Sequence, residues 1–505
     1  MSTLVFYGAT IALGIIIVWR LFHRVKKEEA DHQRRQRAPP SIPWSLPVLG
    51  HLHLMRHPVH QRLAGYASSY GPILSLRFGS RPVLIVSSAA LAEECLVAKD
   101  TAFANRPRLT ASEVFGYDYT AVDSASYGPH WRSLRRIMAH EVLSQARVSS
   151  FAGVREDGVK GFLGKLCRDS GRVTLRVYLS ELTFSLMVRI VMGKRYVNGG
   201  GEEGREFRRI VEEVFLLSGK LCMDDFLPWW VARLLGGGLK ERIVKLGKEM
   251  DELLQNLVDE RRRRRKEMEE TAVIDVLLRL QEKDPGFYSD VIIKGILLTL
   301  VSAGTDTVTG TLEWAMALLL NHPKVLNKAR DEIAMQVGNE RLLTDTDLPE
   351  LNYLHNIIKE TLRLFPAAPV LLPHESAENC TISGFDVPSG TLLLVNAYAI
   401  HRDPELWKDP LKFDPERFDC KVGDQGKDFK YIPFGSGRRG CPGEGFSKRM
   451  MMLTLGSLIQ CFEWERIGEE LVDLDEGEGL AMPKAIPLEA ICKPWPHMLH
   501  LLSQP

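Results

Sequence analysis

The sequence has no excess of charge of either sign. Its 505 residues include 65 Lys and Arg against 64 Asp and Glu. A protein that mainly binds nucleic acid needs a basic surface, and this balance gives no electrostatic argument for such a partner. The length allows two to four domains, although single large folds also reach this size. The apolar fraction of 45% is typical of a globular chain.

Paired cysteines are also lacking. The eight cysteines are scattered, without a CxxC or another paired spacing. This pattern excludes a disulfide scaffold and a multi-cysteine metal site, and it indicates a reducing compartment. The chain has no internal repeat, and no G-x-G-x-x-G follows a strand as in dinucleotide-binding proteins. A nicotinamide or flavin site within the chain is therefore not expected.

The N-terminus carries one long apolar run. Residues 4–19 are uncharged, and Arg20 and further basic residues follow them. The run is slightly shorter than the ~20 residues that span a bilayer, but a snorkelling Arg20 extends it. A cleaved signal peptide has its basic residues before the apolar run. We therefore predict a transmembrane anchor at 1–22, a charged, proline-rich and stiff linker at 23–50, and a globular body at 51–505 on the cytosolic side.

The body is predicted to be mainly α-helical with a minor β portion. Residues 72–88 read as a hairpin that turns at Gly79, and helical periodicity dominates from 89 to 370. Short strands and turns follow until an apolar helix at 444–463. The arginine-rich stretch at 260–270 reads as a solvated helix face and not as a nucleic-acid patch.

A long helix predicted at 295–323 contains the stretch "AGTDT". Gly304 has no side chain, so a bulky flat group would fit against the helix there, and Ala303 and Thr307 share one face. A threonine that bonds back to the preceding turn, next to a glycine, indicates a local kink. Asp306 is costly in this apolar helix unless it is paired or used. A kink with a capped aspartate and a functional site both remain open.

Two other stretches predict a cluster of charges. In "KETLRLFP", Glu360 and Arg363 are three residues apart and can pair on one helix face. Taken alone, this is an ordinary surface ion pair. "FDPERF" adds Arg417, which would complete a buried Glu-Arg-Arg cluster, an arrangement that specifies structure more than it adds stability.

Cys441 stands in the loop "FGSGRRGCPG", directly before a predicted helix. Arg438 and Arg439 supply cations and the helix N-terminus supplies a positive dipole end, and both favour a thiolate. Zinc and iron–sulfur sites need several nearby ligands, whereas this segment offers one. A single thiolate suits a metal that is otherwise held by a macrocycle. A cysteine nucleophile would need an orienting partner, and none lies close in sequence, although a spatial neighbour and a buried core thiol stay open.

In this order, the anchor, the proline hinge, "WRSLRR", "AGTDT", "KETLRLFP", "FDPERF" and "PFGSGRRGCPG" resemble the plant microsomal cytochrome P-450 family. The resemblance covers essentially the whole chain. It implies a cytochrome P-450 fold, heme b as the cofactor, and residues 51–505 as a heme-thiolate catalytic domain. It also implies a single-pass protein of the endoplasmic reticulum membrane that faces the cytosol.

The resemblance implies roles around the heme. Cys441 would be the axial iron ligand, with Phe434 packed beside it and Gly443 allowing close approach. Four residues would contact the heme propionates: Trp131, Arg135, His374 and Arg439. His374 stands where many relatives have arginine, so its contact would be weaker.

Further roles follow from the same resemblance. Asp306 and Thr307 would manage proton delivery during oxygen activation. The cluster of Glu360, Arg363 and Arg417 would be structural, and its loss would prevent folding or heme retention. The following residues would line the substrate pocket, for which core packing is the alternative: Ser112, Phe115, Ser302, Ala303, Ala368, Val370, Leu372 and Met482.

The resemblance also implies the reaction and its partners. The chain would use O₂ together with electrons from NADPH. These electrons would arrive through the FAD/FMN-containing NADPH-cytochrome P-450 reductase. Membrane lipid would surround the anchor. Docking cations would be Arg438, Lys430, Lys448 and Arg449, or these are plain solvated charges.

The C-terminal stretch from Leu455 resembles the branch with isoflavone and flavonoid hydroxylases, lignan bridge-forming enzymes and xanthone synthases. Hydroxylation of a flavonoid-like phenolic is the expected reaction, and Thr307 favours it over bridge formation. Phenol coupling, ring closure, and terpenoid or xenobiotic oxidation are the alternatives within this chemistry. Outside it stand a heme-thiolate isomerase or dehydratase, a non-enzymatic heme-binding membrane protein, and a cysteine-nucleophile enzyme.

Overall fold

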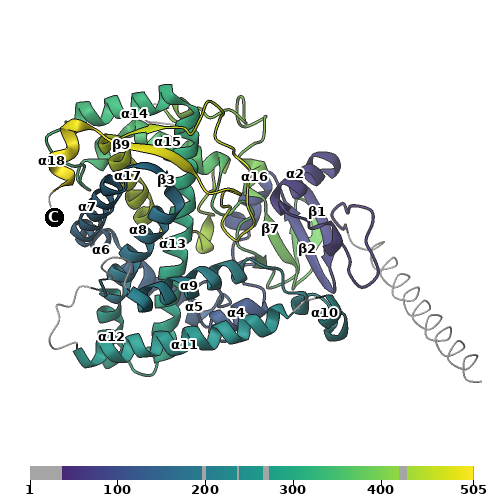
Figure 1. Cartoon of the computed structure of the whole chain (residues 1–505). Helices are drawn as coiled ribbons and strands as arrows, with labels where there is room; N and C mark the ends of the chain where they lie inside the picture. The colour runs from purple at the N-terminus through teal and green to yellow at the C-terminus, as the bar shows by residue number, and fades with distance from the viewer. Residues whose placement is uncertain (1–36, 196–200, 236–237, 265–271, 420–428, 504–505) are drawn as a thin grey trace, which may run out of the picture.

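The computed structural model describes residues 37–195, 201–235, 238–264, 272–419 and 429–503. Most of these residues lie in helices that pack into one body (Figure 1). The helices are α2 (Val59–Tyr70), α3 (Ala89–Glu93), α4 (Thr110–Phe115), α5 (Pro129–Ile137), α6 (Gln145–Ser150), α7 (Ala152–Arg168), α8 (Leu175–Met192), α9 (Gly201–Ser218), α10 (Trp229–Leu235), α11 (Leu239–Arg264), α12 (Val273–Lys283), α13 (Asp290–Asn321), α14 (Pro323–Gln336), α15 (Asn352–Leu364), α16 (Ala397–Ile400), α17 (Glu444–Cys461) and α18 (Leu499–Leu502). The predicted mainly helical class is confirmed.

The strands form three small sheets. They are β1 (Ile73–Phe78), β2 (Arg81–Val86), β3 (Gly171–Thr174), β4 (His374–Glu375), β5 (Cys380–Ile382), β6 (Phe385–Val387), β7 (Leu392–Val395), β8 (Phe462–Glu465) and β9 (Glu489–Pro494). The largest sheet has the order β1-β2-β7-β4, in which β2 and β7 run parallel and the other pairs antiparallel. This sheet lies with α2 and α16 on the opposite side of the molecule from α7 and α18 (Figure 1).

The predicted hairpin is present. β1 and β2 pair in antiparallel register, with Ile73 opposite Val86 at one end and Phe78 opposite Arg81 at the other, and the chain turns at Gly79. Gly79 has φ +58, and a Cβ there would lie 1.8 Å from the carbonyl oxygen of Phe226. Both the backbone conformation and the close approach of another segment therefore require glycine at this turn.

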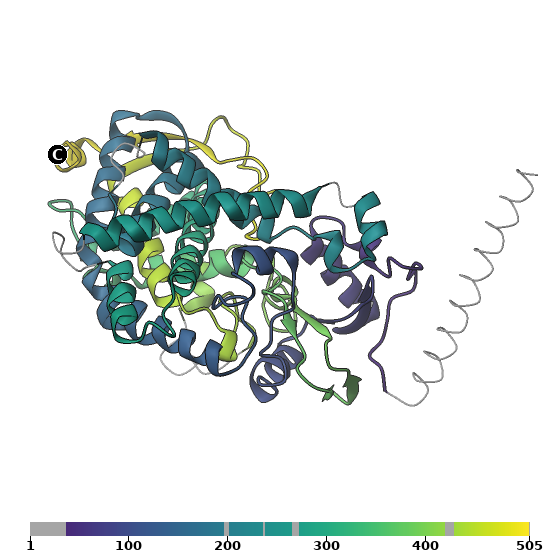
Figure 2. The same ribbon diagram turned by 90° about the horizontal axis from the view of Figure 1, so that it is seen from below.

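Helix α13 runs through the middle of the helical body (Figures 1 and 2). It begins at Asp290, five residues before the predicted start, because Ser289 caps the helix through its hydroxyl. It ends before Pro323, as predicted. Among the described residues it is the one helix long and apolar enough to cross a membrane, but 61% of its most apolar window is buried inside the protein. It is a core helix, as the sequence indicated.

The remaining predictions hold with local corrections. The apolar helix predicted at 444–463 is α17, and the chain passes into β8 at Phe462. In the arginine-rich stretch, Arg262 is exposed as predicted, but Arg261 is buried and binds Asp275 with a closest distance of 2.6 Å. This part of α11 therefore is not only a solvated face, because one guanidinium anchors α12.

The start of the chain is described from Arg37, so the predicted anchor and the charged part of the linker lie outside the described residues. Residues 37–50 contain no helix, as predicted. This segment lies against the body, since the backbone N–H of Ser75 donates to Pro40 and that of Asp386 donates to Arg37. Ile42 is buried in the same cluster as the β1–β2 hairpin.

Candidate functional site

Cys441 occupies a tight loop directly before α17. Its backbone N–H donates to the carbonyl of Phe434 over 2.8 Å, which closes the loop. Gly437 has φ +68, and a Cβ there would lie 2.1 Å from the carbonyl oxygen of Leu96. The nearest protein atom to a Cβ at Gly443 would be the sulfur of Cys441, at 3.8 Å. The loop thus packs closely on one side and leaves space beside the sulfur.

The side chain of Cys441 is exposed and yet lies among protein atoms that raise its pKa, with burial as the first cause. The backbone N–H groups of Gly443 and Glu444 and the guanidinium of Arg135 oppose this shift and favour the thiolate. The helix N-terminus acts as predicted, but burial outweighs it.

The predicted source of the cation beside Cys441 is wrong. Arg438 turns outward and binds Asp100 with an N–O distance of 2.7 Å. Arg439 donates to the carbonyls of Ala104 and Ala125 at 2.7 and 2.6 Å. The cation next to the sulfur is Arg135 of α5, which also donates to the carbonyl of Gly440 over 2.6 Å. The sequence neighbours of a loop cysteine are not its spatial neighbours, because successive side chains point in different directions.

Three guanidinium groups gather near the loop, of which Arg106 is buried and Arg135 and Arg439 are partly buried. Arg439 and Arg106 have pKa values lowered to about 9 and about 10, first by burial, and Arg106 further lowers that of Arg439. Burial also lowers the pKa of Arg135. Within the described part of the chain, no carboxylate oxygen lies within ion-pair distance of any of the three. A surplus of partly or fully buried positive charge beside a lone thiol fits an anionic group such as the two heme propionates.

The other two predicted propionate contacts already use a donor. The indole N–H of Trp131 donates to the carbonyl of Val122 over 3.0 Å. Nδ1 of His374 lies 2.8 Å from the carbonyl of Phe103, so it carries the proton in this bond. Burial, with the charge of Arg106, lowers the pKa of His374 to about 3. A neutral His374 presents an acceptor at Nε2, so a propionate contact would require a second proton on the ring.

The "AGTDT" segment lies in the middle of α13. The hydroxyl of Thr307 donates to the carbonyl of Ala303 over 2.7 Å, which confirms the predicted bond to the preceding turn. Burial, with Glu212 as the next cause, raises the pKa of Asp306 to about 7. Among the described residues, the buried Oδ2 of Asp306 has no hydrogen-bond partner. A carboxyl group that titrates near neutrality at this place suits proton exchange.

The predicted role of Gly304 is wrong. A Cβ at Gly304 would lie 2.6 Å from the terminal methyl of Met187 in α8. This face of α13 is filled by helix packing and does not receive a flat group. The accessible position is Ala303, one residue earlier and about 100° around the helix.

The predicted charge cluster is present, with Glu360 and Arg363 fully buried and the side chain of Arg417 10% exposed. The guanidinium of Arg363 binds both carboxylate oxygens of Glu360 at 2.7 and 2.8 Å. Arg417 donates to the same carboxylate over 2.9 Å, and the backbone N–H of Asp414 donates over 3.0 Å. Glu360 and Arg363 have no accessible surface. The surface-pair alternative is therefore wrong.

The predicted pocket residues fall into two groups. Phe115 and Met482 are 6% and 4% exposed and belong to the main hydrophobic core. The structure thus supports core packing for these two. The others keep accessible surface: Ser112, Ser302, Ala303, Ala368, Val370 and Leu372.

The cations predicted to dock the reductase have partners within the protein. Lys448 binds Glu444, and Arg449 binds Asp345, each over 2.6 Å. Lys430 lies 5.6 Å from the ring centre of Trp407. Intramolecular pairing does not remove these charges from the surface, but it fixes their positions.

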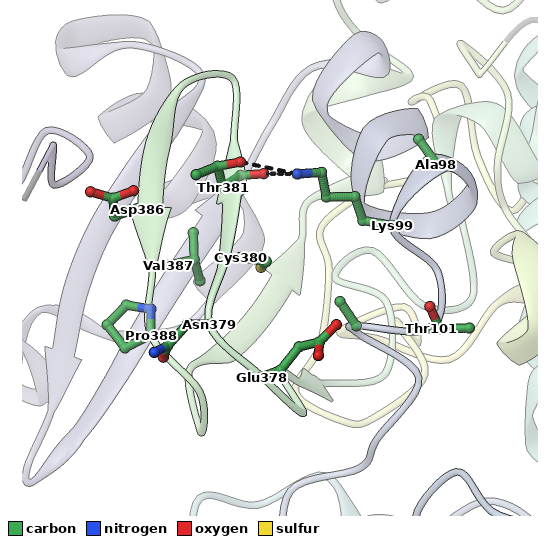
Figure 3. Close-up of a pocket in the computed structure, with 11 residues that line it drawn as sticks. Ala98, Lys99, Thr101, Glu378, Asn379, Cys380, Thr381, Asp386, Val387 and Pro388 are labelled. Atoms are coloured by element: carbon green, nitrogen blue, oxygen red, sulfur yellow. Dashed lines mark hydrogen bonds between the residues drawn. The ribbon is translucent and has the colours of Figure 1, made fainter.

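Two surface grooves lie away from Cys441. One, of about 630 Å³, separates residues 98–102 from the β5–β6 hairpin, and Lys99 crosses it to bind the carbonyl and hydroxyl of Thr381 (Figure 3). The other, of about 500 Å³, lies between α4, α11 and α13. Neither groove includes a residue that the sequence predicted for the site.

Sequence reasoning missed two residues near the site. Arg106 donates to the carbonyls of Leu372 and Pro373 at 2.8 and 2.7 Å, and so joins the cation group to the segment of His374. Asp123 lies in the loop between α4 and α5, near Arg106 and Arg439. Neither belongs to a motif, and only their charge in otherwise apolar surroundings marked them.

Comparison with known proteins agrees with this geometry. The family model described as "Cytochrome P450" matches residues 39–487. The isoflavone 3'-hydroxylase of Medicago truncatula is 43% identical over 504 residues, covering 97% of this chain and 98% of that protein. The (+)-piperitol/(+)-sesamin synthase of Sesamum radiatum is 43% identical over 502 residues, covering 98% of both.

The fold also matches a solved structure. A zebrafish cytochrome P450 structure with progesterone superposes with a TM-score of 0.74 at 25% identity. The match covers 87% of this chain and all of that one. The arrangement of helices and small sheets is therefore the one that the sequence predicted.

Proposed function

Because the chain belongs to the cytochrome P450 family and is a heme b-dependent monooxygenase, we propose that it hydroxylates a flavonoid- or isoflavonoid-like phenolic. The observation that carries the proposal is the Cys441 thiol directly before α17, with three partly or fully buried guanidinium groups near its loop. Among the described residues, no cluster of His, Cys, Asp and Glu offers an alternative metal site. Electrons from NADPH reach such enzymes through a reductase.

The residues around Cys441 would hold the heme. Cys441 would ligate the iron and Phe434 would pack beside it, while Gly443 leaves room near the sulfur. Arg439, Arg135 and Arg106 supply positive charge for the propionates, and Trp131 positions Arg439, whose guanidinium lies 4.4 Å from its ring centre. When bound, heme supplies oxygen activation at iron, with the thiolate as electron donor.

Asp306 and Thr307 would move protons to the site of oxygen activation. With a pKa of about 7, Asp306 both holds and releases a proton at neutral pH. The hydroxyl of Thr307 directs its proton to Ala303, so its lone pairs can accept a hydrogen bond from the cavity side. The cluster of Glu360, Arg363 and Arg417 takes no part in this chemistry and fixes the segments around α15.

The phenolic substrate class is supported by relatives and by Thr307. The Medicago relative is named as an isoflavone hydroxylase at 43% identity. The predicted pocket residues Ala303, Ala368, Val370 and Leu372 are small or aliphatic, and such side chains would suit a planar aromatic molecule. Intact Thr307 favours oxygen insertion.

Ring closure is the second candidate reaction. A sesame relative at the same identity is named as a piperitol and sesamin synthase. Phenol coupling and methylenedioxy-bridge formation start from the same oxygen activation and differ in how the substrate is held. The outcome therefore depends on pocket residues and not on Cys441.

The endoplasmic reticulum membrane is the proposed location, with the body facing the cytosol. Helix α10 exposes Trp229 and Leu234, which are 75% and 79% accessible. The segment before the hairpin exposes Trp44, 60% accessible. Ile42 and Ala232 share one apolar cluster, so these two surfaces are neighbours. A patch of exposed tryptophan and leucine suits contact with lipid at the membrane surface.

Expression in yeast microsomes with a plant reductase tests the function. Flavonoids, isoflavones, benzophenones and diterpenes are offered with NADPH, and products are measured by mass. Gain of one oxygen atom shows hydroxylation, whereas loss of two hydrogen atoms shows coupling or ring closure. Products that form without NADPH would point to an isomerase or dehydratase. No product from any class, with intact heme and reductase, would overturn the proposal.

The Cys441→Ala variant tests the ligand. The reduced wild-type protein with carbon monoxide should show the Soret band of a heme-thiolate, and the variant should lose it completely. A variant that retains this band would show that another residue is the ligand.

A further inference from the structure

Asp123 is a carboxylate without a role in the heme site or in proton delivery. It lies in the loop between α4 and α5, next to the buried Val122 whose carbonyl binds Trp131. Asp123 has accessible surface, although burial raises the pKa of its carboxyl group. Asp123 is therefore exposed and yet lies among protein atoms that raise its pKa, as Cys441 does.

The protein leaves the Asp123 carboxylate largely unpaired. Within the described ranges, no Lys, Arg or His nitrogen lies within 4.0 Å of its oxygens. Arg106 is near, but its Nε donates to the backbone carbonyl of Asp123, over 3.2 Å. Thr299 of α13 lies 3.5 Å from Oδ1, and its only hydroxyl proton has a better acceptor in the carbonyl of Gly295 at 2.8 Å. Apart from its own backbone N–H and the weak contact with Thr299, the carboxylate has no donor among the described residues, so it can accept a hydrogen bond from a ligand.

Asp123 lies at one end of the accessible face of α13. Thr299, Ala303 and Thr307 are spaced by four residues, so they form one stripe along that helix. The Thr307 end carries the proposed proton-transfer residues, and the Thr299 end touches Asp123. The loop itself packs on α13, since a Cβ at Gly295 would lie 3.6 Å from that of Ala121. A molecule lying along the stripe would meet Thr307 and Asp123 at its two ends.

We propose that Asp123 binds the substrate by accepting a hydrogen bond from a phenolic hydroxyl remote from the oxidised carbon. This inference rests on the proposed function, because it specifies how that phenolic is held. Arg106 and Arg439 place positive charge around the carboxylate, which disfavours a cationic amine and leaves a neutral donor as the matching group. A phenol O–H is such a donor, and its methyl ether is not.

Binding of matched ligands to the purified holoenzyme tests the proposal. The pairs are daidzein, naringenin and 4-hydroxybenzophenone, each with its fully O-methylated ether, and the dissociation constants are measured by isothermal titration calorimetry. Wild-type protein should bind at least one phenol more tightly than its ether. Asp123→Ala should weaken binding of that phenol about tenfold or more, which corresponds to one charge-assisted hydrogen bond, and should change ether binding little. Asp123→Asn keeps the shape and one acceptor oxygen, so it should give an intermediate loss.

Asp118→Asn is the matched control, because Asp118 lies in the same loop and is exposed. This variant should bind phenols and ethers as the wild type does. The heme content per chain is measured for every variant, to separate ligand binding from heme loss.

Three outcomes would overturn the inference. Wild-type protein that binds no phenol better than its ether has no phenol anchor. Equal weakening of phenol and ether in Asp123→Ala, or loss of heme in Asp123→Asn, would mean that Asp123 only balances Arg106 and Arg439. Failure of the proposed function looks different, since wild-type microsomes would then oxidise no phenolic at all, whatever the Asp123 variants bind.

Discussion

Two groups of buried and partly buried arginines in this protein are completed in different ways. In the first group, defined as the closed cluster, Arg363 and Arg417 share the carboxylate of Glu360. In the second, the open cluster of Arg106, Arg135 and Arg439, the guanidinium groups donate to backbone carbonyls. Carbonyls satisfy N–H donors but do not neutralise charge. The closed cluster has one carboxylate for two guanidinium groups, whereas among the described residues the open cluster has no carboxylate within ion-pair distance.

This difference separates a structural arrangement from a binding one. The closed cluster already holds a carboxylate of its own, and it joins α15 to the segments around His401, Pro410 and Asp414. The open cluster beside the Cys441 loop gains from anions, and heme brings two propionates. Substitutions should therefore act on folding in the closed cluster and on heme retention in the open one.

The largest effect is expected for Glu360→Gln. This change removes the negative charge between two buried guanidinium groups, and breaking such a pair costs about 3–5 kcal/mol. That is a large part of the total stability of a folded protein, ~5–15 kcal/mol. We expect little or no folded holoenzyme, measured as heme bound per chain in membranes together with resistance to a protease.

The control for Glu360 is an exposed pair. Glu465 binds Lys493 over 3.0 Å, and both are half exposed. Glu465→Gln should leave heme content and protease resistance unchanged. Equal effects of the two substitutions would mean that burial does not distinguish the closed cluster.

Asp306→Asn is expected to lower the turnover number and to leave the heme content unchanged. Asp306 resembles the open cluster in lacking an internal partner, since its buried Oδ2 has no hydrogen-bond partner among the described residues. Loss of a group that exchanges protons lowers rates by about 10² or more. The turnover number with NADPH should fall while heme content stays, and the wild-type dependence of turnover on pH near 7 should flatten.

The same variant makes a prediction about stability. The folded protein raises the pKa of Asp306 from 3.8 to about 7, so it binds a proton that the unfolded chain releases between these values. Stability therefore falls as the pH rises from about 4 to about 7. Asp306→Asn removes this loss and should raise the Tm at pH 8 more than at pH 5. A Tm difference that grows toward low pH would contradict the assigned cause.

Much of the fold could be predicted because its signals are local. The hairpin turn at Gly79, the stop before Pro323 and the start of α17 each depend on a few adjacent residues. The start of α13 was missed because Ser289 caps a stretch whose apolar pattern begins later. Arg261 was missed because charge alone does not tell a solvated guanidinium from one that binds Asp275 across two helices.

Contacts within the site could be predicted only between residues that both belong to recognised sequence motifs. Glu360 and Arg417 are 57 residues apart, and the motifs containing them were enough to join them. The orientation of side chains within a motif was not predictable, so Gly304 faces α8 and Arg438 faces Asp100. Arg106 and Asp123 come from a loop without a motif, and only packing shows that they reach the same place.

Arg439→Met should separate binding from folding. The substitution removes a buried charge whose pKa burial lowers to about 9, so the chain without heme should be as stable as the wild type or more stable. One charge-assisted contact to a propionate is lost, and heme should transfer to apomyoglobin about 10- to 100-fold faster. Reduced stability with unchanged heme transfer would place Arg439 in the same class as the closed cluster.

The smallest effect is expected for Arg438→Gln, which probes the surface next to the open cluster. Arg438 is 45% exposed and binds Asp100 over 2.7 Å, and an exposed pair of this kind contributes about 0–1 kcal/mol. Its backbone N–H also donates to Asp100, so the loop keeps one link to Asp100 after the substitution. Stability and heme transfer should stay near the wild-type values. The KM for the reductase should rise a few-fold at low salt, because a surface charge acts on the encounter with a partner. At high salt this KM should converge with the wild-type value. Faster heme transfer in this variant would show that the open cluster extends to the protein surface.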